Sequence, residues 1–262
     1  MISLERRDGR PLRIGHRGAA ALAPENTLRA FRAAVEAGVD LVEFDVLDLG
    51  GGELVVAHSY DLREASHGVL TGTIQGRTLD GVRADCPELP SLDEALAFFV
   101  EEAPEVGLHL DVKSPSAVPR IARALGELGL VERSLATSFE YRALRRLAEL
   151  EPGVRTGISF PADRAGVHGR HGTARLVRGA LRAFRAVTPR LVPGLLARAG
   201  ATAFVVHHAL ATPATVRAAH ALGAAVVTWT VRDPRDLARV DDAGVDAVVV
   251  DDPTIFVSTL QT

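Results

Sequence analysis

The chain has 262 residues, of which 47% are apolar and 24% are charged, and its formal net charge is −3. This balance argues against a disordered chain and against a general nucleic-acid-binding protein. With one cysteine, Cys86, no intrachain disulfide can form, and the charged segment Met1–Arg10 lacks the apolar core of a signal peptide. No apolar run approaches the ~20 residues that cross a bilayer, so we expect a cytoplasmic protein.

Short apolar segments rich in β-branched residues alternate along the chain with longer segments of helical periodicity. The expected strands are Leu12–Gly15, Asp40–Val46, Gly107–Val112, Ser134–Ser138, Arg155–Ser159, Ala203–His207, Ala225–Val231 and Asp246–Val250. The expected helices include Thr27–Glu36, Leu92–Glu101, Val118–Leu128, Tyr141–Glu149, Ala214–Leu222 and Pro234–Asp242. Alternation of this kind predicts βαβ units and a parallel sheet, hence an α/β fold.

Eight strands favour a closed (β/α)8 TIM barrel, a fold that typically takes about 250 residues. We therefore expect residues 1–262 to form one barrel domain. An open, doubly wound sheet is the alternative, because periodicity alone does not show closure.

One segment after the second strand interrupts the alternation. Gly50-Gly51-Gly52 predicts a turn, and Glu53–His58 predicts an extra strand that folds back on the second. Residues Ser59–Leu89 are then expected to be loop. The barrel would thus carry a hairpin and loop insertion over about residues 50–90, and long excursions of this kind are often functional.

Polar side chains gather where the expected strands end, which is where TIM barrels place their active sites. In chain order they are His16, Arg17, Glu43, Asp45, His58, Asp111, Lys113 and Trp229.

Two pairs in this set have strand spacing. Glu43 and Asp45 share one face of the second strand, and Asp111 and Lys113 repeat that spacing on the third. Carboxylates on an inward face are costly unless they are paired or bound to a cation. Three carboxylates without a soft ligand suit one hard divalent ion, Mg²⁺ or Ca²⁺. A buried salt-bridge network with Arg17 and Lys113 is the alternative.

Two histidines, His16 and His58, end neighbouring strands beside this cluster. Histidine exchanges a proton near neutral pH, so the pair could act as general acid and base across a P–O bond.

Lys113 is the one lysine among 30 basic residues. A compact ammonium differs from a planar guanidinium, which gives a reason for lysine at this position, although chance would also explain it.

Several short motifs follow one another along the chain: His16-Arg17-Gly18, Pro24-Glu25-Asn26-Thr27, Glu43-x-Asp45-Val46, Val55-Val56-x-His58, Leu92-x-Glu94, Asp111-x-Lys113, Ser138-Phe139 and Trp229-Thr230-Val231. Their order and spacing over about residues 13–255 resemble the signature of the glycerophosphodiester phosphodiesterase family. The resemblance implies a metal-dependent hydrolase that converts glycerophosphodiesters to glycerol 3-phosphate and an alcohol. The site roles it implies are metal ligation by Glu43, Asp45 and Asp111, acid–base catalysis by His16 and His58, and substrate contact by Arg17, Lys113 and Trp229.

The sequence departs from the family pattern beside His58. The family usually has aspartate where this chain has Ser59, and it often has arginine near the position of Arg63-Glu64. Ser59 would orient the histidine less strongly than a carboxylate, and we expect Asp61 to substitute.

Two further departures lie at strand ends. The third metal ligand of the family is usually glutamate, and Asp111 is one methylene shorter. Asp251-Asp252 stands where the family usually has Thr-Asp. The shorter side chain of Asp111 is expected to change the position or the affinity of the metal.

The segment from residue 164 to residue 198 contains eight arginines and no acidic residue. Arg175, Arg178, Arg182 and Arg185 have helical spacing, so the segment resembles a basic amphipathic helix that could contact an anionic membrane. An outer barrel helix with a solvated arginine face is the alternative.

Two other functions remain as interpretations of the whole chain. One is a lysophospholipase D-like enzyme that acts on lipids, and the other is a non-catalytic phosphodiester-binding barrel.

Overall fold

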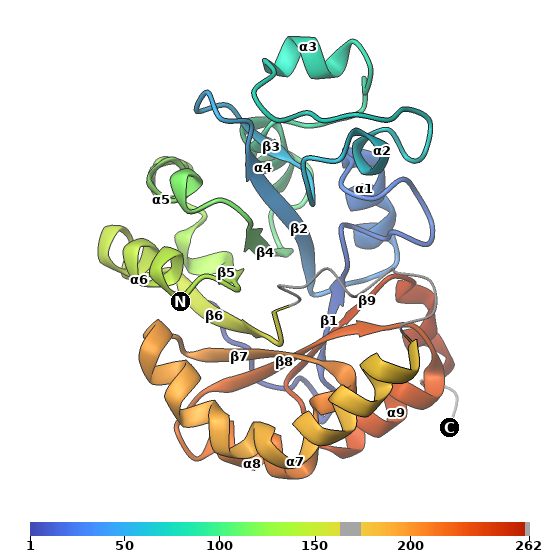
Figure 1. The fold of residues 1–262 in the computed structure, drawn as a ribbon, viewed down its shortest axis with the longest axis vertical. Coiled ribbons are helices and arrows are strands. Elements are labelled where there is room, and N and C mark those ends of the chain that lie inside the picture. The colour runs from blue at the N-terminus through green and yellow to red at the C-terminus, as the bar shows by residue number, and fades with distance from the viewer. Residues whose placement is uncertain (163–173, 260–262) are drawn as a thin grey trace.

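A computed structural model describes residues 1–162 and 174–259 (Figure 1). Within these residues nine strands form one sheet: β1 (Leu12–Gly15), β2 (Leu41–Asp48), β3 (Leu54–Val56), β4 (Gly107–Val112), β5 (Ser134–Ser138), β6 (Arg155–Phe160), β7 (Ala203–His207), β8 (Ala225–Val231) and β9 (Ala247–Val250). All but β3 are parallel to their neighbours, and β1 pairs with both β2 and β9. These two pairings close an eight-stranded parallel barrel, so the TIM barrel is confirmed and the open sheet is excluded.

Helices lie outside the barrel between successive strands (Figure 1). They are α1 (Leu28–Glu36), α4 (Leu92–Glu101), α5 (Val118–Glu127), α6 (Tyr141–Leu150), α7 (Ala174–Ala199), α8 (Pro213–His220) and α9 (Pro234–Asp242), with short 3-10 turns η1 (Pro115–Ala117), η2 (Val131–Arg133), η3 (His208–Leu210) and η4 (Pro253–Thr259). The predicted bounds of the strands and helices agree with these to within two residues.

The insertion after β2 extends from one side of the barrel in Figure 1. As predicted, β3 folds back antiparallel to β2. The expectation of loop over Ser59–Leu89 is wrong in part, because the segment contains two short helices, α2 (Leu62–Ala65) and α3 (Leu79–Arg83). An apolar cluster of its own, which includes Ile74 and Val82, stabilises the insertion.

Side-chain alternation on the strands sorts the residues into two apolar layers and one polar site. The barrel interior contains Ile14, Leu41 and Val249, while Phe31 and Phe44 pack in the layer between strands and helices. Because Leu41 faces inward, residues 43 and 45 face inward too. The interior is therefore apolar at the amino-terminal end of the strands and becomes polar toward their carboxyl-terminal end.

Helix α7 includes the described part of the arginine-rich segment. Residues 164–173 of that segment lie outside the described residues, and so do the side chains of Arg175, Arg178 and Arg182, on which the predicted arginine face depends. In the part of α7 whose side chains are described, Phe184, Val187 and Leu191 are large apolar residues that remain exposed. Among the described residues, no helix has the length and apolar character needed to cross a membrane.

Candidate active site

The chain turns sharply after β1 and brings the backbone of Arg17 and Gly18 against β2. The Arg17 amide donates to Glu43 Oε2 at 2.8 Å, and the Gly18 amide donates to the Glu43 carbonyl at 3.0 Å. Arg17 has φ +51° and Gly18 has φ +87°. A Cβ on Gly18 would lie 2.6 Å from the Ala30 carbonyl carbon in α1, so this position requires glycine.

The Pro-Glu-Asn-Thr segment before α1 supplies three supporting contacts. Glu25 accepts a hydrogen bond from the Arg17 guanidinium at 2.7 Å, and Asn26 donates to Asp45 at 2.8 Å. Thr27 caps α1 by accepting from the Ala30 amide at 3.1 Å. The motif thus joins the helix start to the arginine and to one of the acidic residues.

Three carboxylates, those of Glu43, Asp45 and Asp111, converge inside the barrel mouth. Register pairing places Asp45 opposite Asp111, and oxygens from all three side chains lie within 4.8 Å of one another. Burial, together with the charges of Asp45 and Asp111, raises the pKa of Glu43 well above its ordinary value. Burial acts in the same direction on Asp45, but Lys113 and Arg17 prevail and hold its pKa well below the ordinary value.

Two cations, Arg17 and Lys113, accompany these carboxylates. Lys113 Nζ pairs with Asp45 at 2.8 Å and also with Asp111, while Arg17 Nε lies 3.2 Å from Asp45. The salt-bridge network considered as an alternative to a metal site is therefore present. Among the described residues, however, no arginine or lysine side chain forms an ion pair with Glu43.

His16 lies at one side of this cluster and contacts a carboxylate from the last strand end. Its Nδ1 is 2.5 Å from Asp251 Oδ1, and the second oxygen of Asp251 accepts from Arg232 at 2.6 Å. Burial lowers the pKa of His16, although the hydrogen bond to Asp251 opposes that shift. The sequence placed Asp251 at a strand end but did not predict this partnership.

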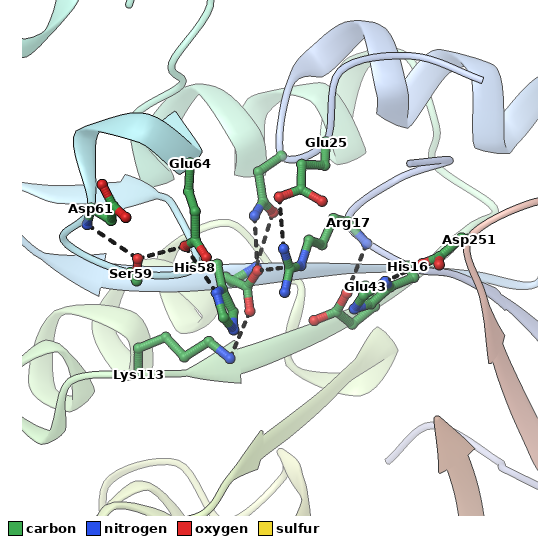
Figure 2. Close-up of polar contacts among 12 residues, drawn as sticks. His16, Arg17, Glu25, Glu43, His58, Ser59, Asp61, Glu64, Lys113 and Asp251 are labelled. Atoms are coloured by element: carbon green, nitrogen blue, oxygen red, sulfur yellow. Dashed lines mark hydrogen bonds and ion pairs between the residues drawn. The ribbon is translucent and has the colours of Figure 1, made fainter. Parts of the chain in front are cut away.

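His58 has an equivalent carboxylate partner, Glu64 of α2 (Figure 2). Its Nδ1 lies 3.1 Å from Glu64 Oε2, and the Ser59 hydroxyl donates to the same oxygen at 2.5 Å. The expectation that Asp61 would take this position is wrong, because Asp61 instead caps α2 through the Arg63 amide at 2.9 Å. Glu64 was missed, although it lies where the family pattern was already seen to change.

Trp229 lies near the end of β8 among aromatic side chains rather than in the acidic cluster. Its ring centroid is 6.0 Å from that of Phe139 and 5.3 Å from that of His207. The indole Nε1 is buried and has no hydrogen-bond partner within the described residues. His109 lies deeper in the barrel, where its Nε2 is 2.9 Å from the Thr137 hydroxyl.

The model of the glycerophosphoryl diester phosphodiesterase family matches residues 16–255. The chain belongs to this family. It is an enzyme, a phosphoric diester hydrolase, with its polar cluster at the end of the barrel where such folds place their catalytic groups.

Individual members of the family align over nearly the full chain. A glycerophosphodiester phosphodiesterase of Caldanaerobacter subterraneus subsp. tengcongensis is 25% identical over 265 residues, which cover 95% of this chain and 97% of that protein. The structure of a glycerophosphodiester phosphodiesterase from Parabacteroides distasonis shares the fold with a TM-score of 0.73 at 23% identity, covering 96% of this chain and 98% of that one. A phosphodiesterase from Oleispira antarctica, solved with the product sn-glycerol-3-phosphate, has a TM-score of 0.71 at 23% identity, covering 96% and 97%.

Proposed function

We propose that this chain hydrolyses glycerophosphodiesters to sn-glycerol 3-phosphate and an alcohol, with one divalent metal ion, Mg²⁺ or Ca²⁺. The observation that carries the proposal is the position of His16 and His58 beside three converging carboxylates. Figure 2 shows Arg17 and Glu43 between the two histidines. The activity for which the Caldanaerobacter relative is named and the product bound by the Oleispira phosphodiesterase support the choice of substrate.

The acidic cluster fits a divalent ion by its charge and its donor atoms. Glu43 is only 5% exposed and lacks a cationic partner among the described residues, a costly state for a carboxylate. Glu43, Asp45 and Asp111 would hold the ion through oxygen ligands, the kind that Mg²⁺ and Ca²⁺ prefer. When bound, the ion supplies positive charge that offsets the negative charge developing on the phosphoryl group.

The remaining groups divide the work of binding and proton transfer. Arg17 and Lys113 would exchange part of their contact with Asp45 for the phosphate oxygens, where fixed positive charge stabilises the transition state. His16 and His58 would serve as general acid and base, a contribution worth ~10²–10⁴-fold in rate. Trp229, with a buried N–H that has no partner among the described residues, would contact the substrate at the barrel mouth.

Lipid substrates are a second candidate, favoured by one observation on α7. Phe184, Val187 and Leu191 are exposed on α7, and the sequence from 164 to 198 contains eight arginines and no acidic residue. Such a surface suits an anionic membrane, from which a lysophospholipase D-like enzyme would take its substrate. Salt-sensitive binding to anionic vesicles, and weaker binding to neutral ones, would support this contact.

One product assay tests both candidates. Purified protein is incubated with glycerophosphocholine or with lysophosphatidylcholine, with Mg²⁺, with Ca²⁺ or with EDTA. We expect metal-dependent release of sn-glycerol 3-phosphate from the first substrate, and loss of most turnover in His16→Ala and His58→Ala with an unchanged circular dichroism spectrum. Full activity in either variant would overturn its acid–base role, and binding without turnover would indicate the non-catalytic barrel.

A further inference from the structure

We propose that Glu64 is a positioning residue for His58. The carboxylate accepts a hydrogen from His58 Nδ1 and so leaves Nε2 as the nitrogen that exchanges protons during hydrolysis. The inference rests on the proposed catalytic role of His58, and it adds a residue that the family pattern does not supply at this place.

The geometry fixes the Glu64 carboxylate from several directions. Glu64 Oε2 receives His58 Nδ1 at 3.1 Å and the Ser59 hydroxyl at 2.5 Å. The Ser59 hydroxyl accepts in turn from the Asp61 amide at 3.1 Å. Asp61 begins α2 by capping the Arg63 amide, and this helix start directs Glu64 toward the histidine. The turn from Ser59 to Glu64 therefore holds the Glu64 carboxylate beside Nδ1 of His58.

The chemistry of imidazole gives this contact a consequence for catalysis. A neutral ring has one N–H, and the hydrogen bond made by one nitrogen sets which nitrogen carries the proton. A carboxylate at Nδ1 favours the Nδ1–H form and stabilises the charged ring after Nε2 takes up a proton. His16 has the same arrangement, with Nδ1 2.5 Å from Asp251. Both candidate acid–base groups are thus held through the same ring nitrogen.

The contact with Glu64 also explains how a serine can stand directly after His58. Where the family usually has an aspartate directly after the histidine, this chain has a serine whose hydroxyl donates to Glu64. The negative charge near the histidine is therefore retained but comes from α2 instead of the adjacent residue. The hydrogen bond from His58 lowers the pKa of Glu64 to about 2, so the carboxylate is charged at neutral pH.

The test is a cycle of four proteins with a matched control. Glu64→Gln keeps the shape and removes the charge, and we expect kcat to fall about 10–100-fold with a much smaller change in KM. Ser59→Asp alone should also lose activity, because it places a second carboxylate against Glu64. The double variant Ser59→Asp/Glu64→Gln should recover part of the loss. Glu88→Gln, an exposed carboxylate of the same insertion that pairs with Arg29, should retain wild-type kcat.

Further measurements separate positioning from a purely structural role. Loss of the anion should shift the pH profile of kcat in Glu64→Gln, whereas a structural role would change only the melting temperature. Nitrogen-15 NMR of the wild-type protein should show neutral His58 with its proton on Nδ1, and this test needs no variant to fold. A proton on Nε2, or a Glu64→Gln enzyme with wild-type kcat and pH profile, would overturn the inference while His58→Ala remained inactive. Activity in His58→Ala would instead overturn the proposed role of His58 itself.

Discussion

The requirement for glycine in the His-Arg-Gly motif can be tested by comparing Gly18 with Gly38, a second glycine that has a similar backbone conformation. Gly18 has φ +87° and Gly38 has φ +75°, so an alanine at either position incurs the left-handed backbone cost of about 1–2 kcal/mol. A Cβ on Gly38 would meet nothing within 4 Å, whereas a Cβ on Gly18 would lie 2.6 Å from the Ala30 carbonyl carbon. Relief of that overlap requires a backbone shift, and overpacking of this kind costs about 1–3 kcal/mol more.

We therefore expect Gly18→Ala to lose about 2–5 kcal/mol of unfolding free energy and Gly38→Ala about 1–2 kcal/mol. Urea denaturation monitored by circular dichroism measures both losses. Gly18→Ala should also lower kcat, because the shift would move the amides that bind Glu43. Equal stability losses in the two variants would refute the argument that the close approach to α1, and not φ alone, requires glycine here.

Three further predictions concern the charged groups. Asp251→Asn should lower kcat, because His16 would lose the charge that stabilises its protonated ring; steady-state kinetics with unchanged kcat would contradict this. Lys113→Arg should lower kcat despite the conserved charge, because a planar guanidinium cannot occupy the compact position between two carboxylates; wild-type kinetics would show that the lone lysine reflects chance. Glu64 has a native pKa of about 2, below its unfolded value, so its contribution to stability is complete above about pH 4.5 and is lost as the pH falls toward 2. Urea titrations of wild type and Glu64→Gln should therefore converge at acidic pH, and a constant difference between them would contradict the assignment.

The barrel and its acidic cluster were predictable because local sequence determines them. Alternating apolar strands and amphipathic helices specify βαβ units, and the spacing of two residues puts Glu43 and Asp45 on one strand face. Parallel register then places Asp45 opposite Asp111. The contribution of the family motifs was to order these pieces into one site.

The partners of the histidines were not predictable, because they depend on how distant or marginal elements meet. Asp251 reaches His16 only because β9 closes the barrel against β1, across 235 positions of sequence. Helix α2 has four residues, too few for helical periodicity to reveal, and its position is set by the Asp61 cap. Asp61 appeared to be the better candidate because it lies nearer to His58 in sequence, yet its carboxylate is used by the helix start.

The site keeps a negative charge beside His58 although its local sequence differs from the family pattern. A hydrogen bond at one ring nitrogen orients a histidine that transfers protons at the other, and imidazole geometry does not dictate which chain segment supplies the acceptor. In this chain the hydroxyl of Ser59 fills the position next to His58 and donates to Glu64, so the serine supports the carboxylate that takes the place of aspartate. Ser59 and Glu64 are therefore one coupled change. Their effects on kcat should be non-additive, because residues that share a hydrogen bond do not contribute independently.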